Sequence, residues 1–153
     1  MRIIQNTKPL RVLSGLLFIF SISNAHAEKI KLVCNVDVVM EYSTGQTDRS
    51  REKIQVDIES INDNTFIFAN GVETGFSMTT KPTKTNPEVT DSSDIDTFEI
   101  DVKHAPKAVG SPAISEYLKL DRNTGMLFYR FVGRLTQTTT GNCSKIDPKK
   151  RAF

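Results

Sequence analysis

Apolar and polar side chains alternate along residues 30–42, and this pattern constrains the fold more than any other feature of the chain. Successive side chains of a β-strand point to opposite faces of a sheet, so alternation over thirteen residues predicts a long strand with one buried face. After a polar turn, residues 53–59 repeat the pattern, which predicts an antiparallel hairpin. The apolar side of the first run comprises Ile30, Leu32, Cys34, Val36, Val38, Met40 and Tyr42.

Shorter runs of the same kind follow, and turn-forming residues separate them. Asn70-Gly71 favours a type I′ turn, in which both central residues have positive φ, and Gly125 can close a later hairpin in the left-handed conformation. Residues 81–94 and 104–115 contain proline and few large hydrophobes, so loops are predicted there, although Pro112 can begin a short helix. The further strands are predicted at residues 65–69, 72–79, 98–102, 117–121, 126–134 and 135–143.

About eight strands at hairpin spacing, without a long helix or an internal repeat, predict an all-β domain built as a single antiparallel meander. A sheet of this many strands must protect its edges, and pairing the first strand with the last would close it as a small barrel. A two-sheet sandwich accounts for the same pattern, so both architectures remain open at this point. The 126 residues from 28 to 153 suit one such domain.

Residues 1–27 have the three parts of a cleavable secretory signal peptide. Three basic residues precede an apolar run at residues 12–22, and Ala25-His26-Ala27 supplies the small residues of a cleavage site before Glu28. Because a membrane-spanning helix needs about 20 apolar residues, this shorter run predicts cleavage and no integral membrane segment afterwards. We therefore expect a mature chain of residues 28–153, located in the periplasm or secreted.

The only two cysteines, Cys34 and Cys143, lie near the two ends of the expected mature chain. An oxidising compartment favours their pairing, which would fasten the first strand to the last. A reactive thiol or a metal-binding pair is the alternative, but the C-x-x-C spacing and a neighbouring histidine are missing. The sequence therefore predicts a structural disulfide between Cys34 and Cys143.

Charge excludes one class of partner. Removal of residues 1–27 leaves 17 basic against 18 acidic side chains, a formal net charge of −1, whereas the pI of about 8.5 belongs to the whole chain. Nucleic-acid binding usually requires a basic surplus, so we expect no nucleic-acid partner. Lys149-Lys150-Arg151 forms a small basic group that can contact an anionic surface, although a solvated tail explains it equally.

Two groups of polar residues have the chemistry of a site. Five carboxylates in residues 91–101 can supply oxygen ligands to calcium, but the spacing is not that of an EF-hand, and alternation places Glu99 and Asp101 on a solvated strand face. His104 can act as a general base, but no G-x-S-x-G or comparable nucleophile context accompanies it. We therefore predict no metal site, no cofactor and no catalytic residue. The carboxylates are Asp91, Asp94, Asp96, Glu99 and Asp101.

Aromatic residues offer a third possibility. The run at residues 127–132 is apolar on both faces, and with Phe66, Phe68 and Phe76 it can line a cavity for an apolar ligand inside a barrel. The same side chains can instead fill a small core, which is the more common arrangement in eight-stranded barrels.

Three motifs near the C-terminus accompany these features: Asp121-Arg122-Asn123-Thr124-Gly125, Gly141-Asn142-Cys143, and the basic and aromatic end Lys150-Arg151-Ala152-Phe153. With them the last part of the chain resembles uncharacterised small secreted bacterial proteins that have a D-R-x-T-G hairpin and a late G-x-C. The resemblance implies the same compartment and fold, and it implies no activity.

The function expected from these observations is non-catalytic binding of a protein partner through the loops at residues 81–94 and 104–116, because long loops on a rigid scaffold commonly carry contacts. The alternatives are a small barrel that carries an apolar ligand and, in third place, an enzyme. The sequence leaves the partner and the oligomeric state open.

Overall fold

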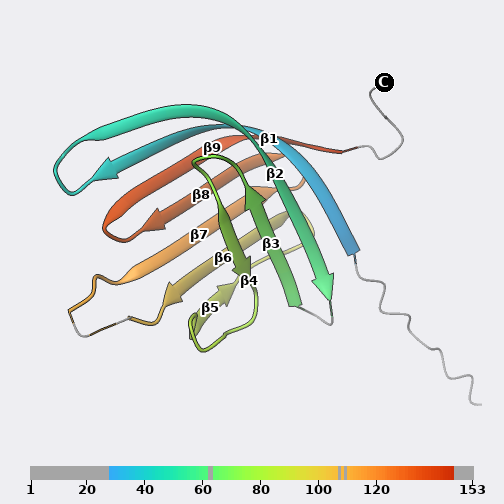
Figure 1. The fold of residues 1–153 in the computed structure, drawn as a ribbon. Helices are drawn as coiled ribbons and strands as arrows, with labels where there is room; N and C mark the ends of the chain where they lie inside the picture. The colour runs from blue at the N-terminus through green and yellow to red at the C-terminus, as the bar shows by residue number, and fades with distance from the viewer. Residues whose placement is uncertain (1–27, 62–63, 107, 109, 147–153) are drawn as a thin grey trace, which may run out of the picture.

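The computed structural model describes residues 28–61, 64–106, 108 and 110–146. These residues form nine antiparallel strands in one sheet and no helix (Figure 1). None of them lies in a helix long and apolar enough to cross a membrane. The strands are β1 (Glu28–Tyr42), β2 (Thr47–Ile61), β3 (Asn64–Asn70), β4 (Phe76–Thr79), β5 (Glu88–Asp91), β6 (Thr97–His104), β7 (Ile114–Asp121), β8 (Met126–Val132) and β9 (Leu135–Lys145).

The sheet forms a nearly closed barrel. Its strand order is β4-β3-β2-β1-β9-β8-β7-β6-β5, so strands that follow one another in sequence pair, with the exception of β4 and β5, and β1 also pairs with β9. Within the described strands, the ring lacks only the ladder between β4 and β5. The predicted all-β antiparallel meander is confirmed, and of the two architectures left open the barrel, with its first strand joined to its last, is the observed one.

The core occupies the inner face of the sheet and is densely filled. On β1, the alternation predicted from the sequence buries Leu32, Cys34, Val36 and Val38 and directs the intervening side chains outwards. Branched aliphatic side chains from the other strands meet them in the interior, where tight packing leaves little room for a ligand. The most deeply buried of these are Ile54, Val56, Ile58, Ile67, Ile100, Val102, Leu118 and Leu127.

One strand was not expected from the sequence. The predicted loop at residues 81–94 contains β5, which pairs with Glu88 opposite Lys103 and Asp91 opposite Ile100. A four-residue edge strand with one inward hydrophobe, Val89, is too short to produce a recognisable alternation, which explains the miss. As a result, residues 80–87 and 92–96 form two separate loops.

Of the two turns predicted at glycines, the one at Gly125 is observed and the one at Gly71 is not. Gly125 has a φ of 75°, so its predicted left-handed conformation is confirmed. Gly71 has no positive φ, and residues 71–75 form a longer connection, so the type I′ prediction is wrong and β4 begins only at Phe76. A Cβ on Gly71 would lie 2.5 Å from Cγ2 of Ile54, so close packing against β2 accounts for this glycine. Pro112 begins no helix and leads directly into β7.

The predicted disulfide is present. Cys34 and Cys143 face each other in the β1–β9 ladder, and their bond joins positions 109 residues apart. Cys34 is fully buried. The bond therefore fastens the two strands whose pairing closes the ring.

Replacing both cysteines by alanine should lower the free energy of unfolding by about 4 to 5 kcal/mol, because the bond restricts a long loop in the unfolded chain. Urea unfolding of the oxidised wild type and of the double variant measures the difference. Reducing agent should destabilise the wild type to a similar extent and leave the double variant unchanged. Equal stability of oxidised and reduced wild type would contradict this role.

Candidate functional site at the loop end

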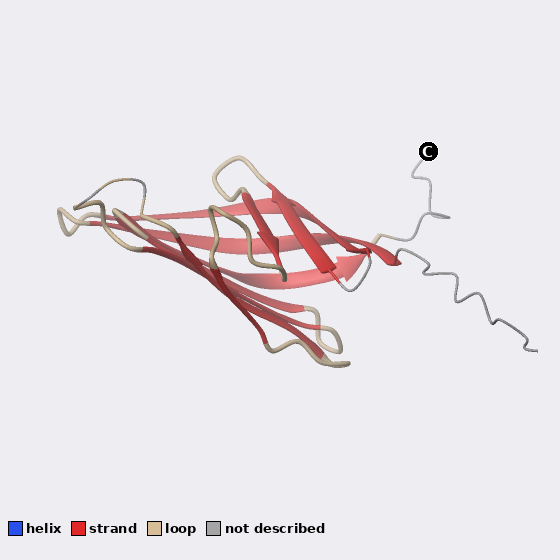
Figure 2. Cartoon of the chain, turned by 90° about the horizontal axis from the view of Figure 1, so that it is seen from below, coloured by secondary structure: helices blue, strands red, loops and turns tan. Residues whose placement is uncertain are grey.

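The end of the barrel formed by residues 43–46, 83–87, 133–134 and the described residues of the loop at 105–113 (105, 106, 108 and 110–113), here called the loop end, leaves part of the inner face uncovered. β3 pairs with β2 only over residues 55–61, and the 71–75 connection packs across the interior beyond it. The longer strands continue past this short hairpin (Figures 1 and 2). Burial decreases accordingly along β8, from Leu127 to Tyr129 at 3 % exposed and then to the half-buried Phe131.

An apolar hollow of about 400 Å³ lies at this end. Ile114, Phe131 and Leu135 line it, and the exposed Arg134 lies beside them. The loop that follows β6 contributes Ser111 and Pro112. The hollow can accept an apolar side chain of a partner, and Arg134 can pair with an adjacent acidic group.

The two predicted partner loops meet at this end only in part. The backbone N–H of Ala105 donates to the carbonyl of Thr85 at 2.9 Å, which brings residues 83–87 beside the start of the 105–113 loop. Residues 92–96 follow β5 and lie at the opposite end, next to Arg122. The predicted surface at residues 81–94 is therefore divided by β5.

A polar cluster lies on the inner face just below the loop end. Glu116 accepts hydrogen bonds from His104 Nε2 at 2.5 Å and from the Tyr129 hydroxyl at 2.8 Å. The Glu116 side chain is 11 % exposed and that of His104 is 23 % exposed. The carboxylate is thus held by two donors in a largely desolvated place, where such hydrogen bonds are stronger than in water.

Tyr129 serves this cluster as a hydrogen-bond donor. Burial, together with the neighbouring Glu116 carboxylate, raises the pKa of its hydroxyl far above the ordinary value, so the group stays protonated. Its ring stacks on Phe76 with the centroids 4.1 Å apart, which fixes its direction.

His104 and Glu116 are hydrogen-bonded as the base and the acid of a catalytic dyad are, but no nucleophile takes part in their hydrogen bonds among the described residues. The cluster's hydrogen bonds among the described residues join His104, Glu116 and Tyr129 and reach no serine, threonine or cysteine side chain. Both cysteines are in the disulfide. In this arrangement Glu116 positions His104 and Tyr129 at the base of the loop end.

A second inward carboxylate, Glu52, holds the 71–75 connection. It accepts the backbone N–H groups of Val72 at 2.8 Å, Glu73 at 3.1 Å and Thr74 at 2.7 Å. Burial alone would raise the pKa of Glu52, but hydrogen bonds from the side chain and backbone of this connection outweigh burial, and the pKa is lowered. Thr74 is completely buried beside Gln137.

Sequence reasoning missed Glu52 and Glu116, although a signal for each was present. Glu52 continues the inward series of Ile54 and Val56, and Glu116 precedes Leu118 and Leu120 at the same spacing. A charged residue at an apolar position of an alternating strand is expected to have specific partners, because an unpaired buried charge is costly.

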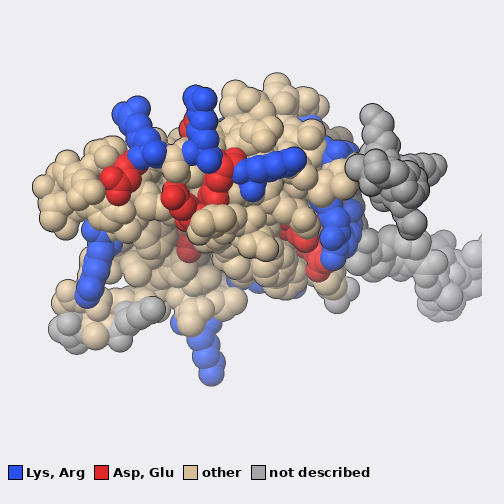
Figure 3. Space-filling model, turned by 45° about the horizontal axis from the view of Figure 1, so that its top comes forward, with Lys and Arg blue, Asp and Glu red and all other residues tan. Residues whose placement is uncertain are grey.

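Charged side chains of both signs are mixed on the outer face around β1 and β2 (Figure 3). Arg51 pairs with Asp37 at 2.5 Å, Lys31 pairs with Asp57 at 3.8 Å, and Lys29 pairs with Glu59. This face therefore has no surplus of one sign that would attract a polyanion. The basic group Lys149-Lys150-Arg151 lies outside the described residues.

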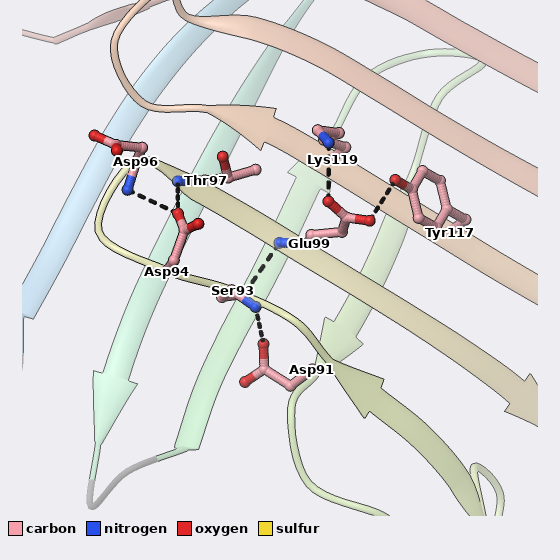
Figure 4. A network of polar contacts seen from close by, with 8 residues as sticks. All are labelled: Asp91, Ser93, Asp94, Asp96, Thr97, Glu99, Tyr117 and Lys119. Carbon is pink, nitrogen blue, oxygen red and sulfur yellow. Dashed lines mark hydrogen bonds and ion pairs between the residues drawn. The ribbon is translucent and has the colours of Figure 1, made fainter.

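The carboxylates of residues 91–101 are separated by their own contacts (Figure 4). Asp91 accepts the N–H of Ser93, Asp94 accepts those of Asp96 and Thr97, and Glu99 binds Tyr117 and Lys119. The part of the chain that the structure describes contains no group of three or more candidate metal ligands. Asp91 and Asp94 thus cap turns, Glu99 forms a surface pair, and Asp101 is exposed on β6.

The predicted aromatic lining of an internal cavity is wrong for three of its members. Ile67 and Ala69 face the core, so Phe66 and Phe68 lie on the outer face, where their rings stack and Phe68 is 43 % exposed. Phe128 likewise faces outwards and contacts Tyr117. Phe131 and Phe76 do face inwards. Equal hydrophobicity on both faces of these strands left the inward set undecided in the sequence.

The sequence matches no protein-family model, and no curated protein matches it.

Replacing Tyr129 by phenylalanine should lower the free energy of unfolding by about 2 kcal/mol, because a hydrogen bond to a buried charged group is lost. The matched control is Tyr117→Phe, whose hydroxyl donates at 3.0 Å to Glu99, a carboxylate more exposed than Glu116 at 31 %, and whose loss should cost within about 0.5 kcal/mol. Urea unfolding of the three proteins makes the comparison. Equal losses would show that the Glu116 cluster contributes no more than a surface contact.

Glu52→Gln should destabilise the protein by about 2 kcal/mol at neutral pH, because charge-assisted hydrogen bonds to the 71–75 connection weaken. The folded-state pKa of Glu52 lies below 4.5, so its contribution is complete above pH 4.5 and is lost as the pH falls through the folded value. Melting temperatures of wild type and variant should therefore converge as the pH falls below 4.5. Glu73→Gln, on the same connection but exposed, should show no such convergence.

Proposed function

We propose that this protein is a non-catalytic binding protein of the periplasm or the extracellular space and that it holds a protein partner at its loop end. The observation that carries this proposal is the apolar hollow formed by Ile114, Phe131 and Leu135 beside Arg134. A partner segment that presents an apolar side chain next to an acidic one complements this surface in shape and charge.

The packing of the barrel supports a surface role over ligand carriage in the interior. The core is filled by aliphatic side chains, several of them with no exposed surface, and three of the aromatics that could have lined a cavity face outwards. The strands below the hollow therefore act as a rigid support for the loops, which is the usual division of labour between scaffold and binding loops.

Export is supported by independent features. Residues 1–27 have the pattern of a signal peptide, and the Cys34–Cys143 disulfide is compatible with an oxidising compartment. The likeness of the C-terminal motifs to small secreted bacterial proteins supports the same location. We accordingly place the working protein, residues 28–153, outside the cytoplasm.

The test uses oxidised residues 28–153 as bait in a cross-linked periplasmic extract, followed by affinity measurement with the purified captured protein. Arg134→Glu should weaken binding about tenfold or more, because it reverses a charge beside the hollow. Replacing residues 105–113 by Asn-Gly should abolish capture while leaving the melting temperature nearly unchanged, since none of the described residues of this loop belongs to the core.

The matched control is Arg130→Glu, which reverses an exposed arginine on the outer face of β8 and should leave the affinity unaltered. Undiminished capture by both the Arg134 and the loop variants would refute a partner site at the loop end. Capture that depends instead on Arg130 would place the contact on the outer face.

A further inference from the structure

A second hollow, of about 300 Å³, lies at the opposite end of the barrel, where the turn at residues 121–125 meets the end of β9. Its apolar wall is made by inner-face residues of four strands, and four of these five side chains are at most 7 % exposed. A hollow of this size stands at the lower limit of small-molecule sites in proteins. The wall residues are Ile30, Leu32, Ile58, Phe98 and Leu120.

Two cations stand at the rim of this hollow. The Arg122 guanidinium lies 3.8 Å above the Phe98 ring and donates to the carbonyl of Ile95 at 3.3 Å, which orders it while leaving further N–H donors. Lys145 lines the same rim and is exposed. Neither makes an ion pair within the described residues, unlike Lys29, Lys103 and Lys119 elsewhere on the sheet.

The acidic groups at the rim are already engaged. Oδ1 of Asp121 accepts the backbone N–H groups of Asn123 at 2.9 Å and Thr124 at 2.8 Å. Oδ1 of Asp96 accepts Nδ2 of Asn123 at 3.0 Å. These contacts direct both carboxylates into the turn, and the N–H donors of Arg122 and Lys145 are left to bind an incoming anion.

We propose that this hollow binds a free aliphatic carboxylate of medium chain length, with the tail against Leu32, Phe98 and Leu120 and the carboxylate between Arg122 and Lys145. Apolar walls with a cationic rim complement an amphipathic anion in both of its parts. The site is at the other end of the barrel from the proposed partner surface and stands independently of it.

The volume sets the length of the tail. At about 30 Å³ for each water-sized group, the hollow accommodates about ten non-hydrogen atoms, which is the size of octanoate. Each methylene that enters an apolar environment gains enough free energy to tighten binding about fourfold. From hexanoate to octanoate, the affinity should therefore rise about fifteenfold, and the gain should level off beyond octanoate.

The experiment titrates oxidised residues 28–153 with hexanoate, octanoate, decanoate and neutral octanol, and follows binding by calorimetry and by backbone amide shifts. Octanoate should bind more tightly than octanol and should shift the amides of residues 30–32 and 120–125. In Arg122→Gln/Lys145→Gln the octanoate affinity should fall at least fivefold, to that of octanol. Ile30→Trp, which fills the hollow from a half-buried position, should weaken both probes.

The charge-matched control is Arg130→Gln/Lys53→Gln, which removes two exposed cations from the outer face and should change neither affinity. Thermal melts of all variants verify that they are folded. Absence of octanoate binding to wild type, equal affinity for octanoate and octanol, or shifts confined to the loop end would each overturn the proposal. None of these results would bear on the capture of a protein partner.

Discussion

The pairing of β1 with β9 is the interaction on which the rest of the barrel depends. Every other ladder joins strands that are consecutive in sequence, so each can form as a local hairpin, whereas this ladder brings together strands separated by most of the chain. Closing so long a loop costs conformational entropy, and folding is slower when contacts are distant in sequence. The Cys34–Cys143 bond lies within this ladder and limits that cost.

Two polar residues on the inner face, Glu116 and Glu52, mark where the apolar core of the barrel ends. Glu116, with His104 and Tyr129, and Glu52, with the 71–75 connection, each terminate an apolar series by a set of satisfied hydrogen bonds. No buried side-chain polar atom among the described residues lacks a partner. A fully satisfied inner network adds rigidity to the walls beneath the loops.

The sequence predicted those features that rest on local periodicity. Alternation on β1 identified its buried side correctly, and the compartment argument identified the disulfide, because both depend on residues that can be interpreted without knowledge of distant neighbours. The inward direction of Phe131 and the outward direction of Phe66 could not be predicted, since register with neighbouring strands decides them. Gly71 shows the same limit, because its contact with Ile54 exists only after β2 and β3 pair. The loop-end hollow combines residues of β7, the 105–113 loop, β8 and β9, and no spacing along the chain predicts it.

The missing ladder between β4 and β5 has a consequence for the connectivity of the molecule. Going round the wall from β5 through β9 and β1 to β4, each strand follows its neighbour as in a simple linear meander, except where β9 meets β1. At that junction the disulfide replaces the hairpin loop that a linear meander would have. The strand order is therefore that of a circularly permuted linear meander, in which residues 80–87 connect β4 to β5 across the seam that has no ladder among the described strands.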